Sequence, residues 1–419
     1  MNDWPCVQIS ELCELIVDCV NKTAPRVEYQ TPYKMIRTTN IKNGRINLTN
    51  CRFVEKETFE KWTKRAKVLK GDVLLTREAP MGQVGLVNYD DKTFLGQRIV
   101  QYRADPKKLD ANYLLYSFLS PYLQHQFRRH NSSGSTVSHI PVPDCLKFEI
   151  LLPPLCEQQK IAAVLSALDA KIDCNNRINA ELEAMAKTLY DYWFVQFDFP
   201  FDFARGKPAA NGKPYKSSGG KMVYNPTLKR KIPAGWEDKH LSQIANITMG
   251  QSPPGKSLNE VGDGMEFFQG STDFGWQFPT VRQYTTKPAR MAKQGDILLS
   301  VRAPVGDMNI ANLDCCIGRG LAALNSKDGF DGFLFYVMQY FKKIFDRRNS
   351  EGTTFGSITK NDLHSLPLAY PPVELLKEYD KVVSRYNKMV FVRSMENQHL
   401  TQLHDWLLPM LMNGQVTVQ

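Results

Sequence analysis

Residues 71–76 read GDVLLT, and residues 295–300 read GDILLS. The match continues, since APMG at 79–82 corresponds to APVG at 303–306. Each block is a short apolar run bounded by Gly, Asp and Pro, which is typical of a buried β-strand between turns. The shared order of the two blocks predicts that the chain contains one fold twice.

Further matches extend this repeat over nearly the whole chain. Trp4 corresponds to Trp236, NSSGST at 131–136 to NSEGTT at 349–354, and the proline pair at 153–154 to the pair at 371–372. The offset between matching residues falls from 232 through 224 to 218, which is the pattern that a duplication with loop deletions produces. Each half therefore has the same plan: a β-rich region, a proline pair suited to a helix start, and a long helix.

An apolar repeat of 3.5 residues predicts that the first long helix runs from about Glu157 to Phe197. The same seam recurs 218 residues later, with Asn179 aligned to Asn397 near its middle. We expect the helices to pack on one another around these asparagines as a buried polar layer. The alternative is a seam through Ile178 and Met185 that leaves the asparagines in solvent. The predicted helix–helix seam comprises Ile161, Leu165, Leu168, Ile172, Asn179, Leu182, Leu189, Val383, Val390, Asn397, Leu400 and Leu407.

The net charge of +10 is unevenly distributed. Residues 1–150 carry 22 Lys and Arg against 16 Asp and Glu, residues 151–200 carry 4 against 7, and residues 201–419 carry 27 against 20. Two basic regions flanking an acidic one favour binding to a polyanion such as nucleic acid. The alternative is an ordinary lysine-rich, solvated surface.

The remaining composition is that of a cytoplasmic globular protein. No run of eighteen apolar residues predicts a membrane span, and MNDWPCVQIS at the start lacks the features of a signal peptide. Nine cysteines without CxxC spacing indicate reduced thiols rather than a disulfide framework.

Taken together, these segments resemble the specificity subunit of a type I restriction–modification system. The resemblance rests on the paired GD[VI]LL…APxG blocks and on the first helix, LPPLCEQQKIAAVLSALDAKIDCNNRINAELEAMAKTLYDYWFVQFDF at 152–199. It also rests on IPAGWEDKHLSQI at 232–244 and ENQHLTQLHDWLLPMLMNGQV at 396–416.

This resemblance implies an α+β fold with two similar α/β target-recognition domains, related by a pseudo-twofold repeat and separated by two long antiparallel coiled-coil helices. The implied boundaries are 1–152 and 236–370 for the recognition domains, 153–200 and 371–419 for the helices, and 201–235 for a linker. Each domain would read one half of an asymmetric, bipartite double-stranded DNA site.

The resemblance also implies partners and the absence of catalysis by this chain. The helices would dock two methyltransferase subunits, and restriction subunits would complete a type I site-specific deoxyribonuclease and adenine methyltransferase. S-adenosylmethionine, ATP and Mg²⁺ would bind to those partners, and this chain would hold no cofactor and no metal. The residues agree, because neither an Asn/Asp-Pro-Pro-aromatic tetrapeptide nor an HExxH motif is present.

One alternative is a P-loop NTPase, since GQSPPGKS at Gly250–Ser257 matches GxxxxGK[ST]. A working phosphate loop presents consecutive backbone N–H groups and then a helix N-terminus. Pro253 and Pro254 remove two of these donors, and Gly262 and Gly264 disfavour a following helix. We therefore interpret the stretch as an early turn of the second recognition domain.

Candidate DNA-contacting residues are basic side chains beside small hydroxyl residues and glycine, a combination that suits approach to a DNA backbone. Arg77 and Arg302 follow the two GD[VI]LL strands, although an ion pair with Glu78 would also account for Arg77. Lys64 and Arg65 lie in the basic run KWTKRAKVLK, which an exposed face explains equally well. The candidates in two matching loops are Arg128, Arg129, Ser132 and Ser133 in the first half, and Arg347, Arg348 and Thr353 in the second.

Overall fold

A computed structural model describes residues 4–130, 138–209, 211–350 and 357–418. The chain forms two compact units. Unit 1 comprises Met1–Cys174 with Asn397–Gln419, and unit 2 comprises Asn175–Glu396. The long helices α5 (Leu155–Tyr190) and α9 (Val373–Met412) are each divided between the two units, α5 after Cys174 and α9 after Glu396.

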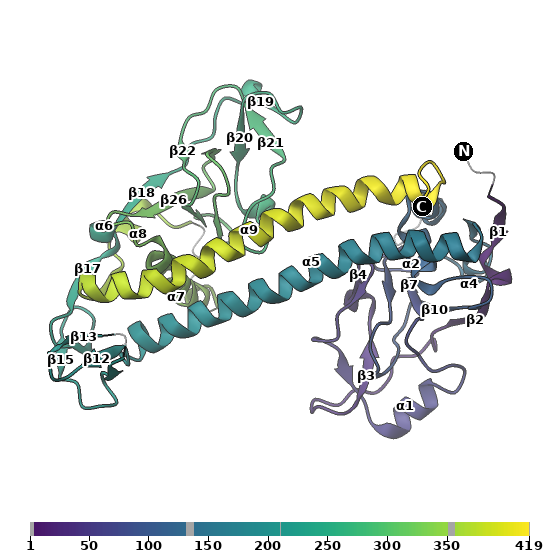
Figure 1. Ribbon diagram of the computed structural model, residues 1–419, viewed down its shortest axis with the longest axis horizontal. Coiled ribbons are helices and arrows are strands. Elements are labelled where there is room, and N and C mark those ends of the chain that lie inside the picture. Colours follow the sequence, from purple (N-terminus) through teal and green to yellow (C-terminus); the bar gives the residue numbers. More distant parts are fainter. Residues whose placement is uncertain (1–3, 131–137, 210, 351–356, 419) are drawn as a thin grey trace. The chain divides into compact units, whose positions relative to one another are not determined.

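Unit 1 is built on an antiparallel sheet of order β2-β10-β7-β8. A second sheet has the order β6-β3-β9, and in it β3 runs parallel to β9. The strands of unit 1 are β1 (Cys6–Gln8), β2 (Cys13–Asp18), β3 (Tyr33–Ile36), β4 (Ile41–Lys42), β5 (Arg45–Ile46), β6 (Arg52–Phe53), β7 (Val73–Thr76), β8 (Val84–Leu86), β9 (Lys92–Leu95), β10 (Ile99–Ala104) and β11 (Glu149–Leu151). Its shorter helices are α1 (Lys56–Trp62), α2 (Ala111–Leu119), α3 (Pro121–Arg128) and α4 (Val142–Cys145) (Figure 1).

Unit 2 repeats this plan. The sheet β18-β26-β23-β24 corresponds to β2-β10-β7-β8, and the parallel pair β20 and β25 corresponds to β3 and β9. The strands are β17 (Glu237–His240), β18 (Ala245–Met249), β19 (Leu258–Asn259), β20 (Met265–Phe268), β21 (Gln283–Thr285), β22 (Met291–Ala292), β23 (Ile297–Ser300), β24 (Met308–Ile310), β25 (Cys315–Ile317), β26 (Leu321–Ser326) and β27 (Pro367–Tyr370). The helices are α6 (Leu241–Ile244), α7 (Asp331–Ser350) and α8 (Lys360–His364). The predicted duplication of a mixed helix and sheet fold is confirmed.

The GD[VI]LL block is the centre of each unit, because every residue of β7 and of β23 is buried. Such continuous apolar runs are typical of strands covered on both faces. Gly71 and Gly295 precede these strands with φ of +92° and +93°, a left-handed conformation that favours glycine. The block is therefore a structural motif.

The aspartate of each block accepts hydrogen bonds in the core. Asp72 is fully buried and accepts bonds from the Leu69 N–H at 2.6 Å, from Gln101 Nε2 at 2.7 Å and from Arg103 Nε at 2.8 Å. In unit 2, Asp296 accepts from the Lys293 N–H and from Asn325 Nδ2, both at 2.9 Å. An ion pair in one unit is thus a neutral hydrogen bond in the other.

The two long helices run antiparallel within each unit. In unit 2, Asn175 donates to Glu396 at 2.8 Å, Asn179 donates to Ser394 at 3.2 Å, and Tyr379 donates to the Ala186 carbonyl at 3.4 Å. Residue numbers thus rise along α5 as they fall along α9. Asn175 and Asn179 are both 1% exposed, so the polar layer is buried there.

The predicted seam residues differ in burial. Those that are buried are Ile161, Leu165, Asn179, Leu182, Val383 and Val390. Those that are half-buried are Leu168, Ile172, Leu189, Asn397, Leu400 and Leu407. Leu408 and Leu411 lie in the same core cluster as Ile161 and Leu165. Leu411, which continues the predicted seam by four residues from Leu407, is buried, and Leu408 is more buried than its neighbour Leu407.

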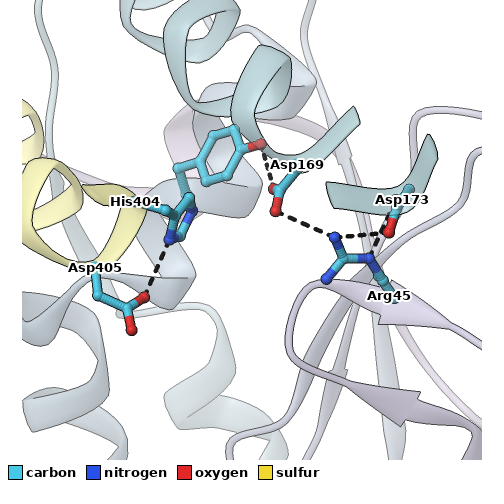
Figure 2. Close-up of polar contacts among 6 residues, drawn as sticks. Arg45, Asp169, Asp173, His404 and Asp405 are labelled. Atoms are coloured by element: carbon cyan, nitrogen blue, oxygen red, sulfur yellow. Dashed lines mark hydrogen bonds and ion pairs between the residues drawn. The ribbon is translucent and has the colours of Figure 1, made fainter. Parts of the chain in front are cut away.

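A polar clamp attaches the β4–β5 hairpin of unit 1 to α5 (Figure 2). Arg45 pairs with Asp169 at 3.2 Å and with Asp173 at 2.9 Å, and the Tyr116 hydroxyl donates to Asp169 at 2.8 Å. Burial, together with the Asp169 carboxylate, raises the pKa of Tyr116 well above its ordinary value, so Tyr116 remains a donor. His404 of α9 packs against the Tyr116 ring, with 6.0 Å between the two ring centroids.

Unit 2 makes the equivalent contact with aromatic rings. Phe278 lies at the position that matches Arg45, because the carbonyls of the residues before them accept equivalent backbone bonds, Gly44 from the Leu86 N–H and Gln277 from the Ile310 N–H. Phe278 packs edge-on against Phe391 of α9 at 5.4 Å. Phe391 is 218 residues after Asp173, the offset of the helical repeat. The same contact is ionic in one unit and aromatic in the other.

Residues 201–209 and 211–235, which belong to the predicted linker, are folded in unit 2. They include β12 (Pro200–Asp202), β13 (Lys207–Pro208), β14 (Lys213–Pro214), β15 (Met222–Asn225) and β16 (Arg230–Pro233). Tyr215 stacks on Phe199 at 4.8 Å, and both rings are buried. A Cβ on Gly212 would lie 2.3 Å from the Phe201 backbone nitrogen, so this glycine allows close backbone approach. The Gly and Pro content reflects tight turns here rather than a flexible chain.

Candidate nucleic-acid interface

The parallel strands of unit 1 bring three separate turns to one edge. Because β3 and β9 pair in parallel with Ile36 opposite Leu95, both strands end at the same edge of their sheet. Arg37 and residues 96–98 follow directly, and the Gly96 N–H donates to the Ile36 carbonyl at 2.7 Å. Thr23, in the turn after β2, donates to Gln97 at 3.3 Å. Residues 21–23, 37–38 and 96–98 are called the strand-end loops of unit 1.

These loops surround a cavity of about 240 Å³ that is lined by four basic side chains and no acidic one. The lining residues are Lys22, Thr23, Met35, Arg37, Thr38, Arg52, Gly96, Gln97 and Arg98. The structure thus places four cations around a space large enough for a small anion. Guanidinium groups are well suited to such a ligand, because their planar N–H donors match the oxygens of carboxylates and phosphates.

Most of these cations have no carboxylate partner. Among the residues described, Lys22, Arg37 and Arg52 form no ion pair, whereas Arg98 lies 3.4 Å from Glu78 in an exposed pair. One terminal nitrogen of Arg37 donates to the Asn50 carbonyl at 2.8 Å, and its buried Nε has no hydrogen-bond partner in the described part of the chain. The guanidinium is therefore held in place while part of its donor capacity stays unused.

A buried thiol behind Arg37 does not offset this positive charge. Burial raises the pKa of Cys51 to about 11, against the opposing effect of Lys34 and Arg37. The thiol is therefore neutral at physiological pH, and the cavity keeps the charge of its four cations.

Unit 2 has the same backbone arrangement. Phe268 pairs with Ile317, and the Gly318 N–H donates to the Phe268 carbonyl at 2.8 Å. A Cβ on Gly96 would lie 2.4 Å from the Ile36 carbonyl oxygen, and one on Gly318 would lie 2.6 Å from Gln269 Oε1. Gly96 meets backbone and so needs to be glycine for close approach, whereas the Gln269 side chain could move away from a Cβ on Gly318. Residues 251–252, 269–270 and 318–320 are called the strand-end loops of unit 2.

The GQSPPGKS stretch contributes Gln251 and Ser252 to these loops, and the P-loop alternative is wrong. Gly255–Ser257 form a single 3₁₀ turn, which strand β19 follows where a phosphate loop needs a helix. The Ser257 hydroxyl is buried and donates to the Pro254 carbonyl at 2.7 Å. The Ser252 hydroxyl donates to Gln269 at 3.1 Å, which ties the stretch to the turn after β20.

Arg77 and Arg302 do not occupy equivalent positions. Glu78 bridges to His139 and Arg302 bridges to Ser357, so Arg302 matches Glu78. Arg77 is half-buried and donates to the Ile140 carbonyl at 2.9 Å, and Glu78 pairs with Arg98. The alternative ion pair between Arg77 and Glu78 is therefore wrong. Arg302 is exposed, as a DNA contact requires.

The other candidates are surface residues or lie outside the described residues. Arg128 ends α3 and Arg129 caps it, and both are exposed. Arg347 and Arg348 belong to α7 rather than to a loop, and the structure does not describe their side chains. The candidates Ser132, Ser133 and Thr353 lie outside the described residues.

Lys64 and Arg65 follow α1 and are exposed, with Arg65 paired to Asp18 at 2.8 Å. None of the described candidates lines the cavity of unit 1. The sequence signal for that cavity was the Thr23-Ala24-Pro25 match to Ser252-Pro253-Pro254, which marks one strand-end loop in each half.

Two further properties bear on the chemistry of the chain. In the described ranges, no group of three or more His, Cys, Asp and Glu side chains is placed to hold a metal ion. No helix among those residues is both long enough and apolar enough to span a bilayer.

Comparison with known proteins places both repeats in one family. A family model described as the type I restriction modification DNA specificity domain matches residues 1–184 and 233–390. The putative type I restriction enzyme MjaX specificity subunit of Methanocaldococcus jannaschii is 30% identical over 100% of this chain and 94% of its own length. The HindI specificity subunit of Haemophilus influenzae is 22% identical over 83% of this chain and 87% of its own.

A solved structure has the same fold. The crystal structure of the type I restriction–modification S subunit from M. genitalium is 18% identical, covers 98% of this chain and 97% of its own, and has a TM-score of 0.61. The P-loop alternative has no support in these comparisons. The chain belongs to the family of DNA specificity subunits of type I restriction–modification systems.

Proposed function

We propose that the chain reads an asymmetric, bipartite double-stranded DNA sequence, with one half read by each repeat. The observation that carries this proposal is that the strand-end loops of unit 1 and those of unit 2 have the same backbone arrangement but different polar side chains. Arg37 of unit 1 matches Gln269 of unit 2, and Gln97 matches Arg319. Different donors and acceptors on one scaffold are what two domains with different half-sites need.

The chain is non-catalytic and acts within an assembly, as specificity subunits do. We propose that two methyltransferase subunits dock on α5 and α9 and that restriction subunits join the same complex. S-adenosylmethionine, ATP and Mg²⁺ then bind to those partners. Since the DNA to be modified lies in the cytoplasm of a prokaryotic cell, the complex works there.

The antiparallel helices support this arrangement. Within each unit, the strand-bearing domain is attached to a helix by a specific contact, the Arg45 clamp in unit 1 and the Phe278–Phe391 pair in unit 2. Such contacts fix the orientation of each domain on its own helix. A recognition domain held in this way presents its reading surface in a defined register.

Binding by the reconstituted complex tests the proposal. The chain is co-purified with its methyltransferase subunits and titrated with the duplex that carries the methylated sequence of the host genome. We expect this duplex to bind at least about a thousandfold more tightly than a scrambled one, the usual lower range for specific recognition. Equal binding to both duplexes would contradict the proposal. ATP binding by the isolated chain that Lys256→Ala abolishes would support the NTPase instead.

A further inference from the structure

The strand-end loops of unit 1 have more positive charge than folding requires. A cluster of like charges opposes folding, because each cation repels the others. Salt bridges elsewhere in unit 1 compensate such charges, as Asp18 does for Arg65 and Asp91 for Lys34. Among the described residues, Glu78 is the one carboxylate that forms an ion pair with these four cations, and its partner is Arg98. The arrangement is explained if a ligand supplies the missing negative charge.

The lining of the cavity favours an oxyanion. Arg37 is fixed by its bond to the Asn50 carbonyl and leaves its buried Nε unpaired, while Lys22 and Arg52 approach from the turn after β2 and from β6. The hydroxyl of Thr38 is already used, because it donates to the Ala79 carbonyl at 2.8 Å. Apart from the Gln97 amide, the available side-chain donors are therefore the cationic ones, which suit a phosphate group.

The corresponding loops of unit 2 are less basic. Arg37 corresponds to Gln269, and Arg98 corresponds to Gly320, because the carbonyls of Arg98 and Gly320 accept equivalent bonds from the Arg77 and Val301 N–H groups. A basic cluster is thus not a requirement of the scaffold itself. We therefore attribute the basic cluster to the ligand that unit 1 binds.

We propose that the cavity formed by Lys22, Arg37, Arg52 and Arg98 holds a backbone phosphate of the bound DNA and so sets the register of unit 1 on the duplex. This inference rests on the proposed function, because the phosphate belongs to DNA. Phosphate contacts position a protein on the duplex and are independent of sequence. The neighbouring strand-end side chain, Gln97, then faces the duplex from a fixed position.

The test uses the complex reconstituted with methyltransferase subunits, carrying either Lys22→Gln or Arg37→Gln. Affinity for the target duplex and for a scrambled duplex is measured over a range of salt concentrations. Each lost phosphate contact should lower the salt dependence, the slope of log K against log salt, by about one. Affinity at low salt should fall by on the order of tenfold for both duplexes alike.

Two variants serve as controls. Lys107→Gln removes the same charge from an exposed turn of unit 1 away from the cavity and should leave the slope unchanged. Arg37→Lys keeps the charge and loses the planar donor pair, so it should keep most of the slope while weakening affinity. Hydrogen exchange of β3 and β9 checks that unit 1 stays folded. If the Arg37→Gln protein does not fold, the Lys22→Gln protein still provides the test.

The outcomes separate the explanations. Cavity variants that behave like Lys107→Gln, or a loss confined to one base pair of the target, would overturn the phosphate assignment. It would also be overturned if inorganic phosphate stabilises the unaltered chain, but not Arg37→Gln, while both bind DNA equally. If the unaltered complex prefers no duplex, the proposed function fails, yet the salt slopes on any duplex still decide the cavity. A fall in slope with both cavity variants, on both duplexes, is the result that we expect.

Discussion

Asp72→Ala is expected to destabilise unit 1 by about 3–5 kcal/mol, the usual cost of removing one partner from a buried ion pair. The carboxylate is fully buried and accepts hydrogen bonds from the Leu69 N–H, from Gln101 and from Arg103. Its loss leaves Arg103, whose side chain is 27% exposed, without a counter-charge. It also leaves the Gln101 amide, which is buried, with one bond to the Lys67 carbonyl.

The repeat supplies a matched control for this prediction. Asp296 occupies the equivalent place in unit 2 and accepts bonds from a backbone N–H and from Asn325, which is neutral. Asp296→Ala should therefore cost less, about 1–3 kcal/mol, the penalty for neutral donors left unpaired. Hydrogen exchange at the amides of β7 and β23 measures each opening free energy separately. Equal losses at the two positions would show that the ion pair with Arg103 is not what distinguishes the units.

Phe194→Ala is expected to destabilise unit 2 by about 3–5 kcal/mol, because it removes a large ring from a packed core. Phe194 lies in the π-helical turn Asp191–Val195 that follows α5. Its ring centroid is 4.9 Å from those of Phe333 and Tyr379 and 6.1 Å from that of Trp236. These rings belong to α7, to α9 and to the start of the second repeat. The space left by the missing Phe194 ring would therefore remove packing contacts from several elements at once.

Tyr192 is the control, since it lies in the same turn with 39% of its surface exposed. Tyr192→Ala should cost well under about 1 kcal/mol, as surface substitutions usually do. Urea unfolding, followed through the local exchange of α7 amides, gives both values. A Phe194→Ala protein as stable as the Tyr192→Ala protein would mean that the aromatic cluster around Phe194 does not stabilise unit 2.

The repeat was predictable because its key residues have strict structural tasks. Gly71 and Gly295 occupy positions with a left-handed backbone, and the strands after them are buried throughout. Few residue types fit such positions, so the repeated structure is visible as a repeated sequence. The first long helix was also predictable, because its apolar period persists over many turns. Its observed bounds, Leu155–Tyr190 followed by a π-helical turn to Val195, agree with the predicted Glu157–Phe197.

Features that depend on contacts distant in sequence were not predictable. Residues 201–235 have the composition of a linker, yet Tyr215 folds back on Phe199, and composition alone contains no sign of that stacking. Arg37 and Arg98 are brought to one cavity by the parallel pairing of β3 with β9, and Arg52 is brought there by the antiparallel pairing of β6 with β3. The three residues form no local motif. The basic run around Lys64, by contrast, is visible in the sequence because its charges are adjacent there.

The most direct test of two half-site readers on one chain is the methylation pattern that the chain directs. Residues 1–152 are replaced by the corresponding segment of a relative that directs methylation to another sequence, and the host genome is sequenced for methylated bases. Because α5, α9 and unit 2's strands are unchanged, one half of the methylated sequence should change, while the other half and the spacing stay the same. A change in both halves, or in neither, would contradict the account.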